Sequence, residues 1–202
     1  MTQEKILRVA LQCFTENGYD GTSMEDIASG VGIRKSSLYA HYRGKEAIFA
    51  AVFEDITREY EEMIGVWTQR DPQQSAVACL GALFEAFILY CHGNLKMYFW
   101  DRYFYYPPAF LKDVIQQRTM ETQGVFVAHI HALLAEGIAE GQIREQPVQG
   151  LALAYYYLMI GISMSVKLYE HDALLGDTRA AWGAFAAGLQ PIATAAVPRQ
   201  GQ

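Results

Sequence analysis

Apolar residues recur along this chain at the three- and four-residue spacing of α-helices, and signals for β-strands are weak. Glycine, proline and asparagine stand where many of these runs stop. The pattern predicts helices over residues 4–17, 24–30, 35–42, 45–67, 73–92, 95–105, 109–140, 148–169 and 178–193. We therefore expect an all-α fold.

The helix expected over residues 45–67 is long and amphipathic. Its apolar residues at helical spacing are Ile48, Phe49, Val52, Phe53, Ile56, Tyr60 and Met63. No repeat, low-complexity segment or flexible tether separates the residues before this helix from those after it. We expect it to connect an N-terminal domain, residues 1–46, with a larger helical domain, residues 47–202, so that the boundary lies within continuous helix.

Residues 22–45 have the spacing of two short helices joined by a tight turn, which is the layout of a helix-turn-helix. Ser23 and Asp26 form a capping-box pattern that predicts a helix start near Met24, and Gly32 ends this helix. The apolar residues that can pack the two helices together are Ile27, Val31, Ile33, Leu38 and Tyr42.

Polar side chains of the second short helix point away from that predicted core, with cations around them. A helix fits the major groove of B-DNA, where hydroxyl and phenol groups can reach base edges while cations hold phosphates. The predicted DNA contacts are Ser23, Arg34, Lys35, Ser36, Ser37, Tyr39, His41, Tyr42 and Lys45. The alternative for such a segment is a solvated surface with no role in nucleic-acid binding.

The charge distribution favours DNA binding over a merely solvated surface. The chain has a formal net charge of −6, yet residues 31–45 contain four cations and no acid. Residues 1–45 hold six Lys or Arg against five Asp or Glu, whereas the rest of the chain holds ten against seventeen. An acidic protein with one locally basic segment is expected to meet DNA by that end only.

From residue 4 to residue 53 the sequence resembles the TetR family of transcriptional repressors. The likeness rests on the Gly-Tyr-x-Gly-Thr-Ser turn at 18–23, the KSSLYAHY segment at 35–42 and the Lys-Glu pair at 45–46. Two features depart from the family pattern: Arg34 cannot cap a helix, and no basic residue precedes Lys5. The resemblance implies a repressor that binds a palindromic double-stranded DNA operator, is released by a small molecule and dimerises through its last two helices.

The last expected helix has a side with almost no bulk, which would let another helix approach closely. Its partner would be the apolar side of the preceding helix. The predicted dimer-interface residues are Leu151, Tyr155, Leu158, Ile162, Ala180, Ala184, Ala187 and Gly188. A two-fold homodimer would bind two half-sites of a palindrome, although the same small residues could instead pack the two helices within one chain.

The middle of the chain is unusually aromatic, with seven Tyr, Phe or Trp among the ten residues 97–106. Aromatic and methionine side chains with a few polar groups line many small-molecule pockets. The predicted ligand-binding residues are Trp67, Phe84, Phe87, Ile88, Cys91, Tyr98, Trp100, Tyr103, Phe104, Phe126, His129, Ile130, Tyr155, Tyr156 and Met159. A plain aromatic core without a ligand is the alternative.

The expected effector is a hydrophobic small molecule whose charge the sequence leaves open. Glu85 and Asp101 stand among apolar residues and could hold a cation together with ring faces. Lys96 and Arg102 could instead neutralise these acids or bind an anionic ligand such as an acyl derivative.

Sequence signatures of enzymes are missing, including GxSxG, HExxH and a phosphate-binding glycine loop. His129 and His131 are two residues apart, so on a helix they point to different sides and cannot easily share a metal ion. We therefore expect no catalysis, no cofactor and no metal. An all-helical carrier or enzyme built around the aromatic residues is the alternative class.

The apolar windows at residues 80–91 and 151–166 are interrupted by Glu85 or contain Tyr, Gly and Ser, which predicts buried helices rather than membrane spans. The cysteines at 13, 79 and 91 are odd in number and lack metal-type spacing, which is typical of a reducing compartment. We expect a cytoplasmic protein with no membrane partner.

Overall fold

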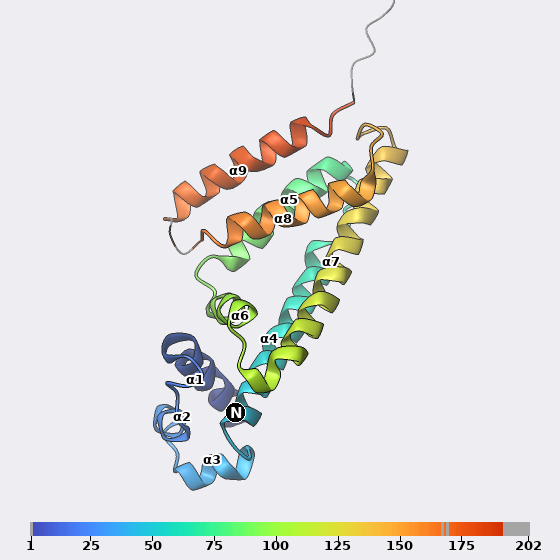
Figure 1. Cartoon of the computed structure of the whole chain (residues 1–202). Coiled ribbons are helices and arrows are strands. Elements are labelled where there is room, and N and C mark those ends of the chain that lie inside the picture. Colours follow the sequence, from blue (N-terminus) through green and yellow to red (C-terminus); the bar gives the residue numbers. More distant parts are fainter. Residues whose placement is uncertain (1, 167, 169, 192–202) are drawn as a thin grey trace, which may run out of the picture. The chain divides into compact units, whose positions relative to one another are not determined.

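The computed structural model describes residues 2–166, 168 and 170–191, and all regular structure in these residues is helical (Figure 1). The elements are α1 Thr2–Asn17, α2 Met24–Val31, α3 Lys35–His41, α4 Lys45–Trp67, α5 Ala76–Cys91, α6 Leu95–Tyr105, the 3-10 turn η1 Ala109–Leu111, α7 Lys112–Ala139, α8 Val148–Ser163 and α9 His171–Ala187. The predicted all-α class is confirmed.

The chain divides into two compact units, each made of two stretches of sequence. The first unit contains Met1–Trp67 and Leu89–Phe126, and the second contains Thr68–Ile88 and Val127–Gln202. The helix α6 and the adjoining parts of α5 and α7 therefore group with the N-terminal helices.

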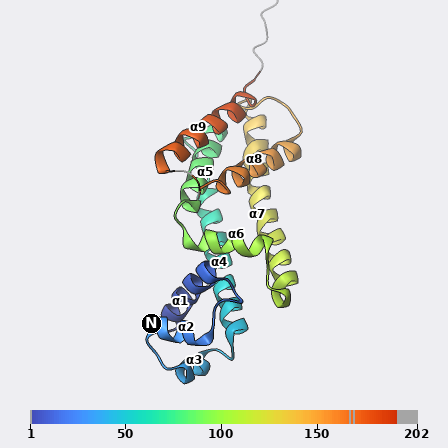
Figure 2. The ribbon, with the colours of Figure 1, turned by 60° about the vertical axis from the view of Figure 1, so that its left-hand side comes forward.

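In the first unit, α1, α2 and α3 lie beside the start of α4 (Figures 1 and 2). Fully buried side chains from these helices and from α6 form one core: Ile6, Phe14, Ile27, Leu38, Phe49 and Phe99. Burial of one large apolar side chain contributes about 1.5–3 kcal/mol relative to exposure. Because α2 and α3 are too short to be stable alone, this core is what holds them in place.

Several helix ends lie where the sequence predicts them. The bounds of α4 and α6 are those expected, and α2 begins at Met24. Gly32 follows α2 in the left-handed region, at φ 78°, and its N–H donates to the carbonyl of Ala28 at 2.9 Å. Asn94 caps α6 by accepting from the backbone N–H of Lys96 at 2.9 Å.

Two helices begin later than predicted because a turn precedes each. The Ser75 hydroxyl accepts from the backbone N–H of Ala78 at 3.1 Å, so Ser75 rather than Pro72 sets the start of α5. The helix expected from residue 109 starts as the single turn η1, in which the Leu111 N–H donates to the Pro108 carbonyl, and continues as α7.

The predicted ends of α8 and α9 are wrong. The helix α8 stops at Ser163, six residues early, where the hydroxyl donates to the carbonyl of Ile160 at 2.9 Å and competes with the helical bonding pattern. The helix α9 starts at His171, seven residues before the predicted start at residue 178. Thr178 is instead a buried residue within the helix whose hydroxyl donates to the Leu174 carbonyl at 2.7 Å. The expected last residues of this helix, 192–193, lie outside the described residues.

Among the described residues, no single helix is both long enough and apolar enough to cross a bilayer. Only α5 and α6 taken together reach that length and hydropathy, and the two are bent from each other by 88°.

Candidate functional site

The helix α3 has one buried anchor and an otherwise exposed surface. Leu38 is fully buried, whereas the other six residues of the helix are exposed, Tyr39 to 49%. The exposed side chains include the hydroxyls of Ser36 and Ser37, the Tyr39 phenol and the His41 imidazole. These are groups that can donate to and accept from base edges in the major groove.

The cations around α3 differ in what they contact. Lys35 comes within 3.8 Å of the Glu25 carboxylate, and both side chains are largely exposed. Arg34 precedes α3 without capping it, as its side chain predicts, and Arg43 follows it. Within the described residues, neither guanidinium has a hydrogen bond or ion pair, so both can receive phosphate oxygens.

Lys45 requires a correction, because its ammonium group is engaged within the protein. It donates to the Tyr19 carbonyl at 2.6 Å and lies 4.2 Å from the centroid of the Tyr19 ring. Lys45 therefore joins the start of α4 to the turn after α1. A change at this residue would alter the N-terminal helices themselves as well as any phosphate contact.

Ser23 and Tyr42 also have structural partners. The Ser23 hydroxyl donates to the Asp26 carboxylate at 2.6 Å and accepts from the Asp26 N–H, while the Ser23 N–H donates back to that carboxylate. The predicted capping box is thus confirmed, and these hydrogen bonds lower the pKa of Asp26. The ring of Tyr42 is buried and its hydroxyl accepts from the Gln3 side chain, so Tyr42 belongs to the core beneath α3 rather than to its exposed surface.

A second lysine with a backbone partner was missed by the sequence analysis. Lys5 in α1 donates to the carbonyl of Val31, the last residue of α2, at 2.7 Å. Its partner is a backbone oxygen 26 residues away, and no side-chain pattern signals such a contact. Lys5 and Lys45 therefore hold the N-terminal helices together, in contrast to Arg34 and Arg43.

Several predicted ligand-binding residues of the first unit belong to one chain of contacting rings. Trp100 of α6 stacks on Phe53 at a centroid distance of 5.6 Å and lies 5.7 Å from Tyr60. Tyr60 also contacts Trp67 at 6.3 Å and Phe126 at 6.5 Å. We call these five residues the α4 aromatic cluster. The sequence placed Phe53 and Tyr60 on an apolar stripe but did not assign them to the ligand site.

Tyr103 and Phe104 do not belong to the α4 aromatic cluster. The Tyr103 hydroxyl donates to the Phe14 carbonyl near the end of α1 at 2.9 Å, and burial raises its pKa to about 12. Tyr103 thus faces α1. Phe104 is 46% exposed, so its ring does not line an enclosed cavity.

Two further predicted ligand-binding residues lie at the end of α5 and in α6. Tyr98 is half-buried and accepts from the backbone N–H of Gly93 at 3.1 Å. Cys91 is buried.

In the second unit, the predicted ligand-binding residues form a packed core, with one exception. Phe84, Phe87, Ile88, Ile130, Tyr155, Tyr156 and Met159 are all buried. The exception is His129, which is exposed and does not face this core. The sequence analysis missed two aromatic residues of α9 that complete the core: Trp182 lies 5.9 Å from the Phe84 ring, and Phe185 lies 5.7 Å from the Tyr155 ring.

Tyr155 is wrongly assigned to the dimer interface. It is fully buried within the second unit, and its hydroxyl donates to the Leu80 carbonyl at 2.6 Å. Burial raises its pKa well above the ordinary value. A residue with this environment packs α8 against α5 in one chain and presents no surface to a second chain.

The other predicted interface residues are exposed or half-buried and so remain accessible to a second chain. Ala180, Ala184, Ala187 and Gly188 are exposed, and Leu151, Leu158 and Ile162 are half-buried. Tyr157 and Met164 of α8, which the sequence analysis did not single out, are 59% and 52% exposed.

The charged residues near the aromatic segments have partners that the sequence did not predict. Glu85 accepts from Arg179 of α9 at 2.7 Å, so this carboxylate is already paired with a cation. Lys96 donates to Asp55 and Glu59 of α4. Burial alone would lower the pKa of Lys96, but the hydrogen bonds and the negative charges of Asp55 and Glu59 together outweigh burial and raise the pKa. In the part of the chain that the structure describes, no group of three or more His, Cys, Asp or Glu residues is arranged so that it could hold a metal ion.

Comparisons with known proteins agree with the helix-turn-helix geometry. Residues 6–52 match the family model for bacterial regulatory proteins of the tetR family. The same region is 49% identical over 47 residues to IcaR of Staphylococcus epidermidis, the HTH-type negative transcriptional regulator of the biofilm operon icaADBC. That alignment covers 23% of this chain and 25% of IcaR, so the chain spans about a quarter of the length of the curated relatives it matches.

Solved structures extend the likeness in fold to nearly the whole chain. A TetR transcriptional regulator from Chloroflexus aurantiacus superposes with a TM-score of 0.73 at 23% identity, over 92% of each chain. The regulator FadR from Bacillus subtilis, solved with stearoyl-CoA, gives a TM-score of 0.66 at 18% identity, over 93% of this chain and 99% of FadR. At these identities the likeness concerns the fold alone. Over residues 6–52, the sequence and the helix-turn-helix that it forms are therefore similar to those of bacterial regulatory proteins of the tetR family.

Proposed function

We propose that this protein is a ligand-responsive, DNA-binding transcriptional regulator that acts in the cytoplasm. The observation that carries the proposal is the surface of α3. Its hydroxyl, phenol and imidazole groups are exposed, Leu38 is its fully buried anchor, and the guanidinium groups on either side have no partner among the described residues. In this proposal residues 1–46 form the DNA-binding domain. The helix α3 enters the major groove while Arg34 and Arg43 hold phosphates.

Repression is the proposed outcome of DNA binding, because IcaR, which shares the helix-turn-helix region, is a negative regulator. A single helix-turn-helix contacts few base pairs, so we propose a homodimer on a palindromic operator. The surface proposed for dimerisation is the exposed face of α9 around Ala180, Ala184 and Ala187, with the apolar residues Leu158 and Ile162 of α8.

The proposed effector is a hydrophobic small molecule bound at the α4 aromatic cluster. FadR is a regulator of the same fold that was solved with stearoyl-CoA, which supports the class of ligand. Three members of the cluster, Phe53, Tyr60 and Trp67, stand on α4, which begins four residues after α3 ends. A ligand that favours one position of α4 would therefore also favour one position of the recognition helix.

Selection of bound DNA from a random duplex pool with the purified chain tests the proposal. The expected result is an enriched inverted repeat whose affinity falls steeply with salt. Lipophilic compounds, including acyl-CoA esters, are then screened by quenching of Trp100 and by release of the selected operator. Failure to enrich any sequence, together with weak and salt-independent binding, would favour an all-helical carrier instead.

A further inference from the structure

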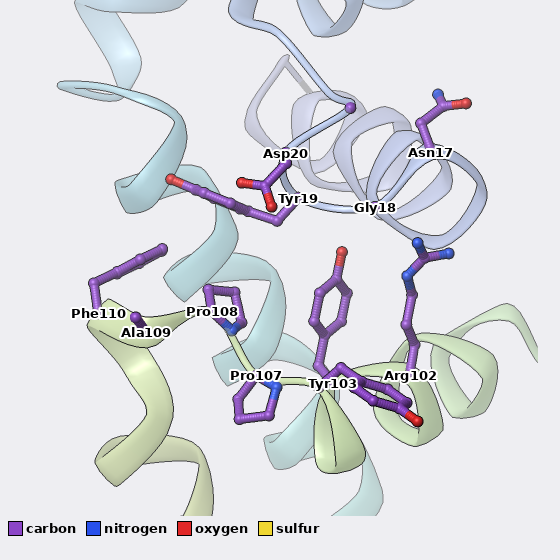
Figure 3. A pocket seen from close by; sticks show the side chains of 12 residues that line it. Asn17, Gly18, Tyr19, Asp20, Arg102, Tyr103, Pro107, Pro108, Ala109 and Phe110 are labelled. Carbon is purple, nitrogen blue, oxygen red and sulfur yellow. The ribbon is translucent and has the colours of Figure 1, made fainter.

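A cavity of about 540 Å³ lies in the first unit, lined by the turn that follows α1 and by the segment that links α6 to α7 (Figure 3). Cavities of about 300–1,000 Å³ hold small molecules in many proteins. The cavity shares only Tyr103 with the ligand-binding residues predicted from the sequence, and it shares none with the α4 aromatic cluster. None of its lining residues is assigned a contact with DNA, effector or a second chain in the function proposed above.

Aromatic rings form much of the cavity wall. Tyr19, Tyr103, Tyr106 and Phe110 all line it, together with two prolines. The rings of Tyr19 and Phe110 lie 5.0 Å apart at an angle of 50°. Tyr106 is 82% exposed and Phe110 41% exposed, so large ring surfaces remain in water at this place. A flat aromatic ligand would cover surface that the protein itself leaves uncovered.

Two opposite charges line the same cavity without neutralising one another. Arg102 donates one hydrogen bond, from Nη1 to the Thr15 carbonyl at 3.0 Å, and within the described residues it forms no ion pair. A guanidinium group has five N–H donors, so most of its donors remain available. The Asp20 carboxylate has no hydrogen-bond or ion-pair partner among the described residues. In the view of Figure 3, these two groups lie on either side of the Tyr103 hydroxyl.

The turn after α1 is shaped to admit the guanidinium group. Gly18 adopts φ 78°, a backbone conformation that residues other than glycine rarely adopt. A Cβ atom at this position would stand 2.6 Å from Nη2 of Arg102, which is closer than Cβ atoms come to other heavy atoms in proteins. Glycine at position 18 therefore allows Arg102 to lie against the end of α1, where the Thr15 carbonyl fixes it.

We propose that this cavity is a binding site for a small aromatic zwitterion, of which the free aromatic amino acids are the simplest examples. The ligand carboxylate would accept from Arg102, its ammonium group would face Asp20, and its ring would pack among Tyr19, Tyr106 and Phe110. An aromatic anion would satisfy Arg102 but bring two carboxylates together, and an aromatic cation would do the reverse. Only a ligand with both charges matches both residues.

Isothermal titration calorimetry of the full chain with three probes that share one ring tests the proposal. L-Phenylalanine carries both charges, 3-phenylpropionate lacks the ammonium group, and 2-phenylethylamine lacks the carboxylate. We expect L-phenylalanine to bind at least about tenfold more tightly than either of the others, because one charge-assisted contact is lost in each. No DNA is present in this assay, so its outcome does not depend on the proposed regulation of transcription.

Single substitutions assign each contact. Arg102→Gln should weaken L-phenylalanine and 3-phenylpropionate by about tenfold and spare 2-phenylethylamine, and Asp20→Asn should weaken L-phenylalanine and 2-phenylethylamine instead. Arg144→Gln and Asp113→Asn, exposed charges outside the cavity, serve as controls. Asp20→Asn removes no hydrogen bond within the part of the chain that the structure describes, so it keeps the test valid even if loss of the bond from Arg102 to Thr15 disturbs folding.

Three results would overturn the proposal. The first is no binding of L-phenylalanine at millimolar concentration. The second is binding that neither Asp20→Asn nor Arg102→Gln weakens. The third is 3-phenylpropionate binding as tightly as L-phenylalanine with no effect of Asp20→Asn, which would define a site for anions.

Discussion

The exposed faces of α3 and α9 differ in the chemistry that they offer to a partner. Around α3, hydroxyl, phenol and imidazole groups stand between the guanidinium groups of Arg34 and Arg43, which form no hydrogen bond or ion pair with any residue that the structure describes. Along α9, the exposed residues at 180, 184 and 187 are alanines, which have no side-chain hydrogen bonds to offer. The first surface suits a polyanion with polar base edges, and the second suits close approach of another helix.

A second difference separates the cations of the N-terminal helices. Lys5 and Lys45 donate to backbone carbonyls, whereas Arg34 and Arg43 have no partner within the described residues. The net charge of a segment therefore overstates the number of charges that are free to bind DNA.

The largest effect is expected where α3 is anchored. Leu38→Ala removes the only buried side chain of this helix, which should cost about 2–5 kcal/mol of stability. The neighbouring exposed substitution Tyr39→Ala should stay within about 0.5 kcal/mol. Chemical denaturation of both variants measures the difference. Equal stability of the two would mean that α3 does not depend on this single anchor.

The next effect concerns the α9 surface. Ala184→Glu should dissociate the proposed dimer, because overpacking costs about 1–3 kcal/mol and a buried unpaired charge costs more. Ala128→Glu, at an exposed alanine of α7, is the matched control and should leave the molar mass unchanged. Light scattering gives the molar mass. A wild-type monomer at micromolar concentration would remove the interface proposal.

A smaller effect should separate the two kinds of cation. Arg43→Ala should leave stability unchanged and reduce the slope of log affinity against log salt by about one. Lys45→Ala should lower stability by about 1–2 kcal/mol, since it removes a hydrogen bond and a cation–π contact to Tyr19. Thermal melting and operator titration at several salt concentrations measure both. If Lys45→Ala changed only the salt slope, the structural role of Lys45 would be wrong.

The smallest effect is expected at the cap of α2. Hydrogen bonds from Ser23 lower the pKa of Asp26 below its ordinary value of 3.8. A carboxylate with a lowered pKa in the folded state stabilises the fold above its unfolded-state pKa and loses this contribution as the pH falls through the folded-state pKa. The stability difference between wild type and Asp26→Asn should therefore be constant near neutral pH and shrink below about pH 4. A difference that grew on acidification would contradict this assignment.

The sequence predicts local structure well where one residue decides it. Ser23 and Gly32 mark the ends of α2 because capping and positive φ are properties of single residues. The bounds of α9 fail for the opposite reason. Thr178 has the side chain of a cap, yet its hydroxyl donates to Leu174 within a helix that began seven residues earlier. Leu174 and Thr178 are both buried within the second unit, and this burial, rather than the capping preference of Thr178, sets the helical conformation of these residues.

The functional residues likewise divide into those that the sequence predicts and those that only the fold reveals. The exposed residues of α3 follow from helical spacing, because Leu38 alone faces the core. The roles of Lys45, Arg102 and Tyr103 could not be predicted, since each donates to a backbone carbonyl distant in sequence, on Tyr19, Thr15 and Phe14. The tertiary fold alone brings these atoms together.

The central claim, that the exposed face of α3 recognises DNA sequence, is tested most directly by comparing wild type with Tyr39→Ala. Each protein's affinity is measured for the selected operator and for a scrambled duplex of the same length at one salt concentration. We expect Tyr39→Ala to lose about fivefold to 150-fold in the ratio of these affinities, the equivalent of about 1–3 kcal/mol of base discrimination, while binding to the scrambled duplex is unchanged. An unchanged ratio would show that this face does not contact bases.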